Sequence, residues 1–485
     1  MTADFDALVA HRLPLAEATL RLLDFAFDAA FLRTVFDHHH GRSYEHDLAF
    51  PTFVQLILDA LIGHRGSAHQ SFQQADQNDR LPVSVQALYG KLRRVPLDLS
   101  LALFTHTAQR LQTVAPPAIA QPLPASVHGF QVVAFDGKKL KYVAKRLKAV
   151  RGLKGEVSGG KLLVAQDVAT QLAIAAFAVP DGEAGDNPLV GPVVDQLRTQ
   201  SDRPRLWIGD RAFCDFPLMH RLSDGADHFL IRYNSACKFH VDPGTPSRTG
   251  TDTRGRCYAE EWGWLGNGTN ANRVRVRRIT LALPGGESLS VVTSLEDAQA
   301  YPASDLLTVY RCRWGIETLF QQVVQTFDLR HLIGSTPSAT VFQAMLCLLL
   351  YNSTLLIRAC VAAAAPVTAA EVSLELLWGD VVRELTAWTN VLSVDETMAV
   401  LRDRPRLDGA GVWADLRARL SGVWQKRWTK APTRRGAVPP KNRAYICGGH
   451  TSVEKILRGK HHEIPLGTAP NQPPPHQTKR PQQDV

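Results

Sequence analysis

The sequence predicts a mixed α/β fold, and three observations along the chain lead to this prediction. Residues 128–234 alternate short apolar strands with amphipathic helices, which is the pattern of an α/β core. Residues 235–300 hold short strands separated by glycines, which indicates a β-rich insertion. Residues 1–125 and 301–430 show helical spacing of apolar positions. We therefore expect an α/β core that carries a β-rich insertion and is flanked by helical regions.

The N-terminal region is predicted to consist of helices. Ser84 is a good N-cap for a helix that ends in Lys91, Arg93 and Arg94. These basic residues either recognise DNA, as in a helix-turn-helix region, or compensate the dipole of a helix in a plain bundle. The predicted helical segments are residues 13–32, 53–62, 84–94 and 97–114.

The central region predicts three strands, a helix, a strand, a second helix and a last strand. Each strand is a short apolar run bounded by turn residues. The pattern alone is compatible with several α/β folds. The strands are residues 130–136, 161–168, 172–179, 204–210 and 227–233, and the helices are residues 186–200 and 214–224.

The insertion contains a strand in which Arg273, Arg275 and Arg277 alternate with valines. A period of two places the three guanidinium groups on one face of a sheet, where they could lie along a phosphate backbone. Trp262 and Trp264 alternate in the same way, and we expect them to pack in the core. The predicted strands are residues 256–264, 272–283 and 288–294.

Helices are predicted for most of the remaining chain. The most apolar run, residues 341–365, contains Gln343, Asn352 and Arg358, so we interpret it as a buried helix and expect no membrane partner. The helices are residues 302–326, 338–364, 368–389, 394–403 and 411–428.

The positive charge is concentrated in two segments. The net charge of the chain is +9, and residues 425–485 alone contain 12 basic and 3 acidic residues, so residues 1–424 sum to zero. Residues 138–161 hold nine basic residues, among them Lys138, Lys139 and Lys141, and one acid. Both segments suggest a polyanionic partner, although a solvated tail or loop is the alternative for each. Seven cysteines without a Cys-x-x-Cys motif, and an N-terminus without a signal peptide, suggest a reducing cytoplasm.

Three acidic residues stand out as candidate metal ligands. Asp136 and Asp210 each end a short apolar strand, where a sheet presents its ligands. Tyr310, Arg313 and Glu317 are spaced by three and four residues, so they share one flank of a helix. Two strand-end aspartates and a helical glutamate suit a two-metal phosphoryl-transfer site. Taken singly, each acid could equally be a cap or an ion-pair residue.

These blocks, Asp136-Gly, Gly-Asp210-Arg and Tyr310-x-x-Arg313-x-x-x-Glu317, resemble the three catalytic blocks of DDE transposases, most closely the insertion-sequence-four family. The resemblance implies a ribonuclease-H-like core and metal-dependent cleavage and joining of DNA. Asp136, Asp210 and Glu317 would be catalytic and would hold two Mg²⁺ ions, for which Mn²⁺ can substitute. Tyr310 and Arg313 would bind the phosphate beside the scissile one.

The expected partners are the terminal inverted repeats of an element and a target, both double-stranded DNA, and a second copy of the chain when DNA is bound. We expect the protein in a bacterial cytoplasm, associated with the nucleoid when it binds DNA. The residues expected to contact DNA are Tyr310, Arg313, Lys138, Lys139, Lys141, Arg273, Arg275 and Arg277. Two alternatives are a transposase-derived DNA-binding protein and a ribonuclease-H-like nuclease without strand transfer.

The sequence departs from the family pattern at Val324, where relatives have a lysine. We expect a lysine or arginine from elsewhere, such as Arg330 or a residue of 138–161, to lie beside the Tyr310–Glu317 face toward position 324. The expected divisions are a helical DNA-binding domain at 1–125, the core at 126–234, the insertion at 235–300, the glutamate helix and next helix at 301–365, a helical region at 366–430 and a basic tail at 431–485.

Overall fold

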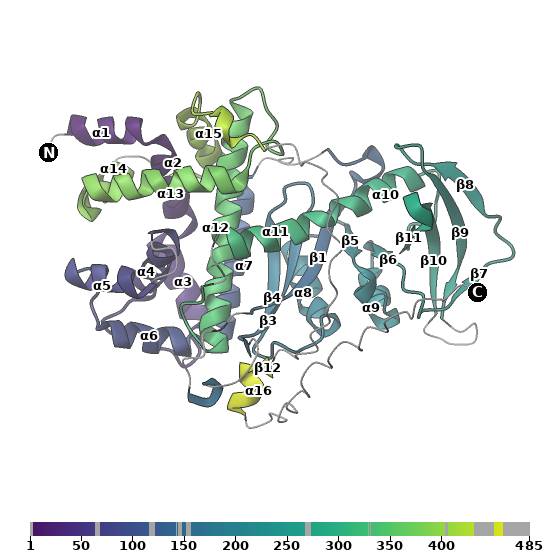
Figure 1. Cartoon of the computed structure of the whole chain (residues 1–485), viewed down its shortest axis with the longest axis horizontal. Helices are drawn as coiled ribbons and strands as arrows, with labels where there is room; N and C mark the ends of the chain where they lie inside the picture. The colour runs from purple at the N-terminus through teal and green to yellow at the C-terminus, as the bar shows by residue number, and fades with distance from the viewer. Residues whose placement is uncertain are drawn as a thin grey trace, which may run out of the picture.

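A single sheet runs through the molecule, with most helices gathered at one end of it and the insertion at the other (Figure 1). The computed structural model describes residues 3–63, 68–115, 122–141, 143, 148–151, 157–266, 273–327, 329, 331–402, 406–430 and 451–458. Most of the basic tail and much of the basic segment 138–161 lie outside the described residues, as does Arg330.

The sheet has ten strands in the order β4-β3-β1-β5-β6-β11-β10-β9-β7, with β8 paired to β9. Its first half contains β1 (Gln131–Lys139), β3 (Lys161–Asp167), β4 (Ala173–Val179), β5 (Arg205–Gly209) and β6 (His228–Arg232). Strands β1, β3 and β4 form an antiparallel meander, whereas β5 and β6 lie parallel to β1 and to each other. The helices α8 (Asn187–Gln200) and α9 (Phe216–Leu222) make the connections that these parallel strands require. The predicted order of strands and helices is confirmed.

The insertion continues this sheet. Strand β11 (Ser288–Thr293) pairs with β6, β10 (Val274–Ala282) pairs with β11, and β9 (Cys257–Leu265) pairs with β10. These are the three predicted strands. Two further strands, β7 (Phe239–Val241) and β8 (Arg248–Thr251), were not predicted, because runs of three and four residues carry too little periodic signal.

The N-terminal and C-terminal helical regions pack together. Helix α13 (Leu374–Val391) packs on α2 (Pro14–Ala26), and α15 (Gly409–Arg419) packs on α7 (Leu97–Val114). The Glu384 side chain on α13 accepts hydrogen bonds from the free backbone amides of Leu15 and Ala16, at 2.8 and 3.1 Å. The carboxylate provides acceptors for backbone N–H groups at the start of α2 that have no partner within the helix. The other helices around them are α1 (Ala3–Arg12), α3 (Ala29–His39), α4 (Phe50–Gly63), α5 (Ala68–Gln77), α6 (Val85–Arg94) and α14 (Val394–Arg402).

Helix α12 (Pro337–Ala363) lies between this helical mass and the sheet (Figure 1). It is long and apolar enough to cross a membrane by composition, yet its most apolar window is entirely buried within the protein. The Asn352 side chain on α12 accepts a hydrogen bond from the backbone N–H of Ala173 and donates one to its carbonyl, which fixes the helix against β4. The prediction of a buried helix is confirmed.

The helix predicted over residues 302–326 is divided in two. Helix α10 (Ala303–Cys312) ends, and α11 (Trp314–Gln325) begins, at Arg313. Arg313 keeps helical dihedral angles (φ −51°, ψ −31°), so the chain continues in nearly the same direction. The division lies within the Tyr310–Glu317 block.

Candidate active site

Asp136 lies on β1, and Asp210 directly follows the neighbouring parallel strand β5. The register pairs Ala134 of β1 with Ile208 of β5, so Asp136 and Asp210, each two residues further along the chain, lie at the same level at the end of β5. One carboxylate oxygen of Asp136 accepts a hydrogen bond from the backbone N–H of Gly137 (2.8 Å). Asp210 accepts one from the backbone N–H of Ala212 (2.8 Å), which fixes the turn after β5. The sheet therefore brings together two carboxylates that are 74 positions apart in sequence.

The environment of Asp136 disfavours its charged form. Burial raises the pKa of Asp136 to about 6; the negative charges of Asp210 and Asp186 act in the same direction, and the Gly137 hydrogen bond and Arg313 act against it. A carboxylate held near others in a partly buried site is stabilised by a cation. This observation fits a hard metal ion with oxygen ligands.

Arg313 connects the third acid to this pair. Its Nη2 donates to Glu317 Oε1 at 2.7 Å, and its charge also acts on Asp136. Tyr310 is buried next to Arg313; burial raises its pKa, and Arg313 opposes the rise. The structure thus places Asp136 near Asp210 and Arg313, and Arg313 in turn contacts Glu317 and Tyr310. Within the described residues, no three Asp, Glu, His or Cys side chains are arranged to hold a metal ion, and Glu317 pairs with Arg313 instead.

Asp186 is a neighbour of Asp136 that the sequence did not indicate. Its carboxylate lies against Gly137, where a Cβ atom would come within 1.7 Å of Asp186 Oδ1, so a larger residue there would displace this carboxylate. Lys161 Nζ pairs with the same oxygen at 2.8 Å and also donates to the Ala184 carbonyl. The sequence feature that could have indicated this neighbour is the Asp136-Gly137 dipeptide, since a glycine beside a candidate ligand allows another group to approach the backbone closely.

Lys138 extends from β1 to α11, with its Nζ 5.6 Å from the centre of the Phe320 ring. Phe320 lies one turn beyond Glu317 and one turn before Val324. Burial lowers the pKa of Lys138, Lys141 lowers it further, and Asp136 raises it. Lys138 therefore lies beside α11 on the side toward position 324. This is where we expected a basic residue to replace the family lysine, because position 324 is a valine in this chain. Lys139, the next residue on β1, pairs in register with Lys161.

Strand β10 places its arginines on one face, as predicted, but that face is not exposed along its whole length. Arg275 lies opposite Trp264 and Arg277 opposite Trp262, so arginines and tryptophans do share a face. Arg277, however, is fully buried: it pairs with Glu260 and donates to the Tyr301 carbonyl at 2.7 Å. The prediction that Arg277 contacts DNA is therefore wrong, because Glu260 and the Tyr301 carbonyl bury its guanidinium.

The two remaining arginines of this strand are closer to the surface. Arg275 is partly exposed and pairs with Asp242 and Glu296, each at 2.9 Å. The Arg273 guanidinium lies 4.1 Å from the centre of the Trp264 ring. Trp262 is buried, as predicted, and donates its indole N–H to the Glu296 carbonyl.

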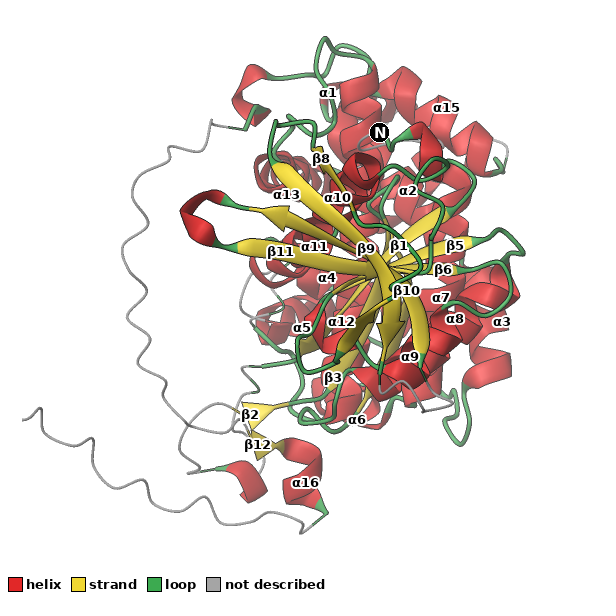
Figure 2. Ribbon diagram, turned by 90° about the vertical axis from the view of Figure 1, so that its right-hand side faces the viewer, coloured by secondary structure: helices red, strands yellow, loops and turns green. Residues whose placement is uncertain are grey.

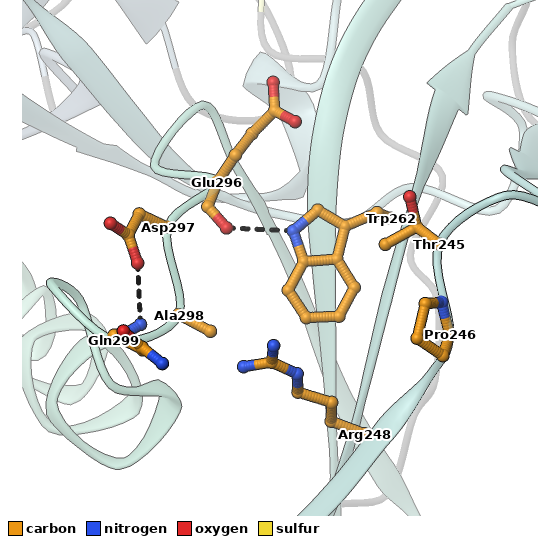
Figure 3. Close-up of a pocket in the computed structure, with 8 residues that line it drawn as sticks. All are labelled: Thr245, Pro246, Arg248, Trp262, Glu296, Asp297, Ala298 and Gln299. Atoms are coloured by element: carbon orange, nitrogen blue, oxygen red, sulfur yellow. Dashed lines mark hydrogen bonds between the residues drawn. The ribbon is translucent and has the colours of Figure 1, made fainter.

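A cavity of about 250 Å³ opens beside Trp262 (Figure 3), and none of Asp136, Asp210 and Glu317 lines it. Arg248 extends over the Trp262 ring there, with 5.5 Å between its guanidinium and the ring centre. The cavity is lined by Thr245, Pro246, Arg248, Trp262, Glu296, Asp297, Ala298 and Gln299.

The basic end of α6 is only partly available to a partner. Ser84 caps the helix as predicted, through the backbone N–H of Ala87. Lys91 turns inward and donates to the Leu48 carbonyl, whereas Arg93 and Arg94 are exposed. The hydroxyl of Thr336 donates to the Arg93 carbonyl, so this end of α6 lies beside the start of α12.

Comparison with known protein families gives a match to the region that contains these residues. Residues 128–353 match a family model described as "Transposase DDE domain". A solved structure of the piggyBac transposase synaptic complex with hairpin DNA aligns with a TM-score of 0.38 and 13% identity, covering 89% of this chain and 88% of that chain. That similarity is too low to transfer residues between the two chains. No curated protein matches the chain significantly. Residues 128–353, which include Asp136, Asp210 and Glu317, are therefore similar to transposase DDE domains.

Proposed function

We propose that this chain is a DNA transposase of the insertion-sequence-four type, which binds the ends of its element, cleaves them and joins them to target DNA. The observation that carries the proposal is that Asp136 lies near Asp210 and Arg313, and that Arg313 pairs with Glu317, in a region similar to transposase DDE domains. The order β4-β3-β1-β5-β6, with β3 antiparallel to β1, supports a ribonuclease-H-like core.

Each residue of the site has a role in this proposal. Asp136, Asp210 and Glu317 would hold two Mg²⁺ ions, or Mn²⁺, which supply Lewis acidity at the reacting phosphate. Arg313 would exchange its ion pair with Glu317 for one with a DNA phosphate, because a guanidinium group binds carboxylates and phosphates alike. Tyr310 orients Arg313 from the buried side. The DNA duplex is the substrate, and a second copy of the chain would bring the second end.

Cleavage of DNA by the full-length chain tests this function. The substrate is the DNA that flanks the gene, chosen for short inverted repeats. With Mg²⁺ we expect strand cleavage at the repeat end, and in EDTA none. Asp210→Asn should reduce the cleavage rate by about 10³-fold, because it removes a proposed metal ligand. DNA binding should stay within about twofold, because the proposal gives Asp210 no contact with DNA.

Other results would point to the alternatives. Specific binding without any cleavage would support a transposase-derived DNA-binding protein. Cleavage without joining to a target plasmid would support a nuclease. Equal cleavage by the wild type and Asp210→Asn would contradict the proposed site.

Lys138 provides a second test, because we propose that it neutralises phosphate charge in place of a lysine at 324. Lys138→Met should lower the cleavage rate at saturating DNA by about 10- to 100-fold, equivalent to roughly 1.4–2.8 kcal/mol. Adding Val324→Lys to this variant should restore part of the rate, since both positions lie next to Phe320. The matched control is Lys139→Met, which removes the same charge from the next position on β1. An unchanged rate in Lys138→Met would rule out this role.

A further inference from the structure

The C-terminal segment 451–458 returns to the core and docks beside the catalytic strands. Strand β12 (Thr451–Ser452) pairs in parallel with β2 (Val157–Ser158), and helix α16 (Val453–Leu457) follows it. Both views show β12 and α16 at the same end of the molecule, and Figure 2 shows β12 beside β2. Strand β2 precedes β3 directly, so the segment joins the hairpin that β1 and β3 form.

Specific contacts fix this segment. The Ser452 hydroxyl accepts a hydrogen bond from the Gly182 amide at 3.2 Å, and the Ser452 amide donates to Glu183 Oε1 at 2.9 Å. Lys455 Nζ lies 2.6 Å from Glu183 Oε2 and 3.7 Å from an oxygen of Asp181. Ser452 and Val453 are fully buried. Residues 451–458 therefore belong to the folded core, unlike a solvated tail.

The loop that this segment holds leads to the candidate active site. Asp181, Gly182 and Glu183 begin the connection between β4 and α8, and Asp186 ends it. Lys161 Nζ donates a hydrogen bond to the Ala184 carbonyl of this loop and forms an ion pair with Asp186. The Asp186 carboxylate then lies against Gly137, directly after Asp136. One face of the loop thus touches the C-terminal segment and the other touches the strand that carries Asp136.

The packing leaves the loop little freedom to move on its own. A Cβ atom at Gly182 would come within 2.1 Å of the buried Ser158 hydroxyl, so the loop lies closely on β2. The next residue after Ser158, Gly159, is similarly close to Thr340 of α12, whose hydroxyl donates to the Gly159 carbonyl. The position of the loop is consequently set by β2 and the C-terminal segment together.

We propose that residues 451–458 form a strap, and that its Lys455–Glu183 ion pair positions the 181–186 loop, and with it Asp186, beside Asp136. The part that concerns cleavage rests on the proposed transposase function. Lys455 and Glu183 are positioning residues, since they act on the site through the loop. The basic residue Lys455 thereby serves an internal contact, whereas the sequence suggested a DNA contact for the whole tail.

Charge reversal and its rescue test the strap in the full-length chain. Lys455→Glu should accelerate hydrogen exchange at least about fivefold in peptides that cover residues 157–163 and 181–186, because opening of the loop becomes easier. It should lower the cleavage rate at saturating DNA by about 10-fold, with DNA affinity and the melting temperature nearly unchanged. The double variant Lys455→Glu/Glu183→Lys should restore both exchange and cleavage, and Lys455→Arg should retain both.

The control is Arg458→Glu, which makes the same change of charge three residues later. Arg458 is exposed and pairs with Glu454 of its own helix, so this variant should leave exchange in the loop unchanged. If Lys455→Glu and Arg458→Glu weaken DNA binding equally and Glu183→Lys rescues neither, Lys455 contacts DNA and the strap is wrong.

The two proposals fail in different ways. A wild-type protein that cleaves no DNA would count against the transposase function, while the exchange measurements would still decide whether the strap exists. A wild type that cleaves DNA, with loop exchange unaffected in Lys455→Glu, would overturn the strap alone.

Discussion

Replacing Asp136 by asparagine should abolish DNA cleavage and at the same time stabilise the metal-free protein. The loss of cleavage should reach about 10³-fold or more, because the variant lacks a carboxylate shared by the site. In EDTA at neutral pH, the free energy of unfolding should rise by up to ~3 kcal/mol. The physical reason is that a neutral amide at this position avoids both the burial of a charge and its repulsion by Asp210 and Asp186.

The pH dependence of this effect has a definite sign. The pKa of Asp136 is raised from 3.8 to about 6 in the folded protein, so the folded state binds more protons than the unfolded chain between these values. The stability of the wild type should therefore fall as pH rises through this window, and the penalty should be constant above it. Asp136→Asn should lack this component, so the difference in melting temperature between the two proteins should grow from about pH 4 to pH 6.

Metal addition and a surface control complete this experiment. Mg²⁺ should raise the melting temperature of the wild type more than that of Asp136→Asn, since binding to the folded state stabilises it. Asp195→Asn removes an exposed carboxylate from α8 and should change neither cleavage nor the Mg²⁺ effect. A metal-free Asp136→Asn protein that melts below the wild type would show that the carboxylate contributes favourable contacts outweighing its burial.

The second large effect is expected for stability, at the buried pair Arg277–Glu260. Arg277→Met should lower the free energy of unfolding by ~3–5 kcal/mol, because it leaves the Glu260 carboxylate buried without its partner. The double variant Arg277→Met/Glu260→Leu should recover most of this loss, since two apolar side chains leave no buried charge. The midpoint of urea or thermal unfolding measures both effects.

The adjacent pair supplies a matched control for this prediction. Arg278 pairs with Glu261 at 2.5 Å, one position along the same two strands, but both side chains remain partly exposed. Arg278→Met should therefore cost at most ~1 kcal/mol. The Arg277→Met/Glu260→Leu protein should also retain the salt dependence of DNA binding, and a reduced salt slope would mean that Arg277 reaches phosphate after all.

Local patterns were sufficient to predict the elements of the core. Apolar runs that end in Asp136 and Asp210 predicted β1 and β5, because strand periodicity and strand ends are properties of a few consecutive residues. The spacing of Tyr310, Arg313 and Glu317 predicted their common flank for the same reason. The division between α10 and α11 at Arg313 was not predictable, since both sides keep helical dihedral angles and helical composition.

The arginine strand shows where local pattern stops being informative. A period of two correctly placed Arg275 and Arg277 on the face of Trp264 and Trp262. Whether that face meets solvent depends on what the rest of the chain packs against it. Glu260 and the Tyr301 carbonyl bury Arg277, while Arg275 stays near the surface. Two arginines that belong to the same sequence pattern are therefore exposed to solvent to different degrees.

The sequence by itself determined the order of strands and helices in the core and the buried character of α12. Only the tertiary structure decided that Asp186 borders Asp136, that Lys138 reaches α11, and that Lys455 pairs with Glu183 across 272 positions of sequence. The reason is physical: periodicity reports the face on which a side chain lies, whereas its partner is set by chain segments brought together only when the sheet and helices pack.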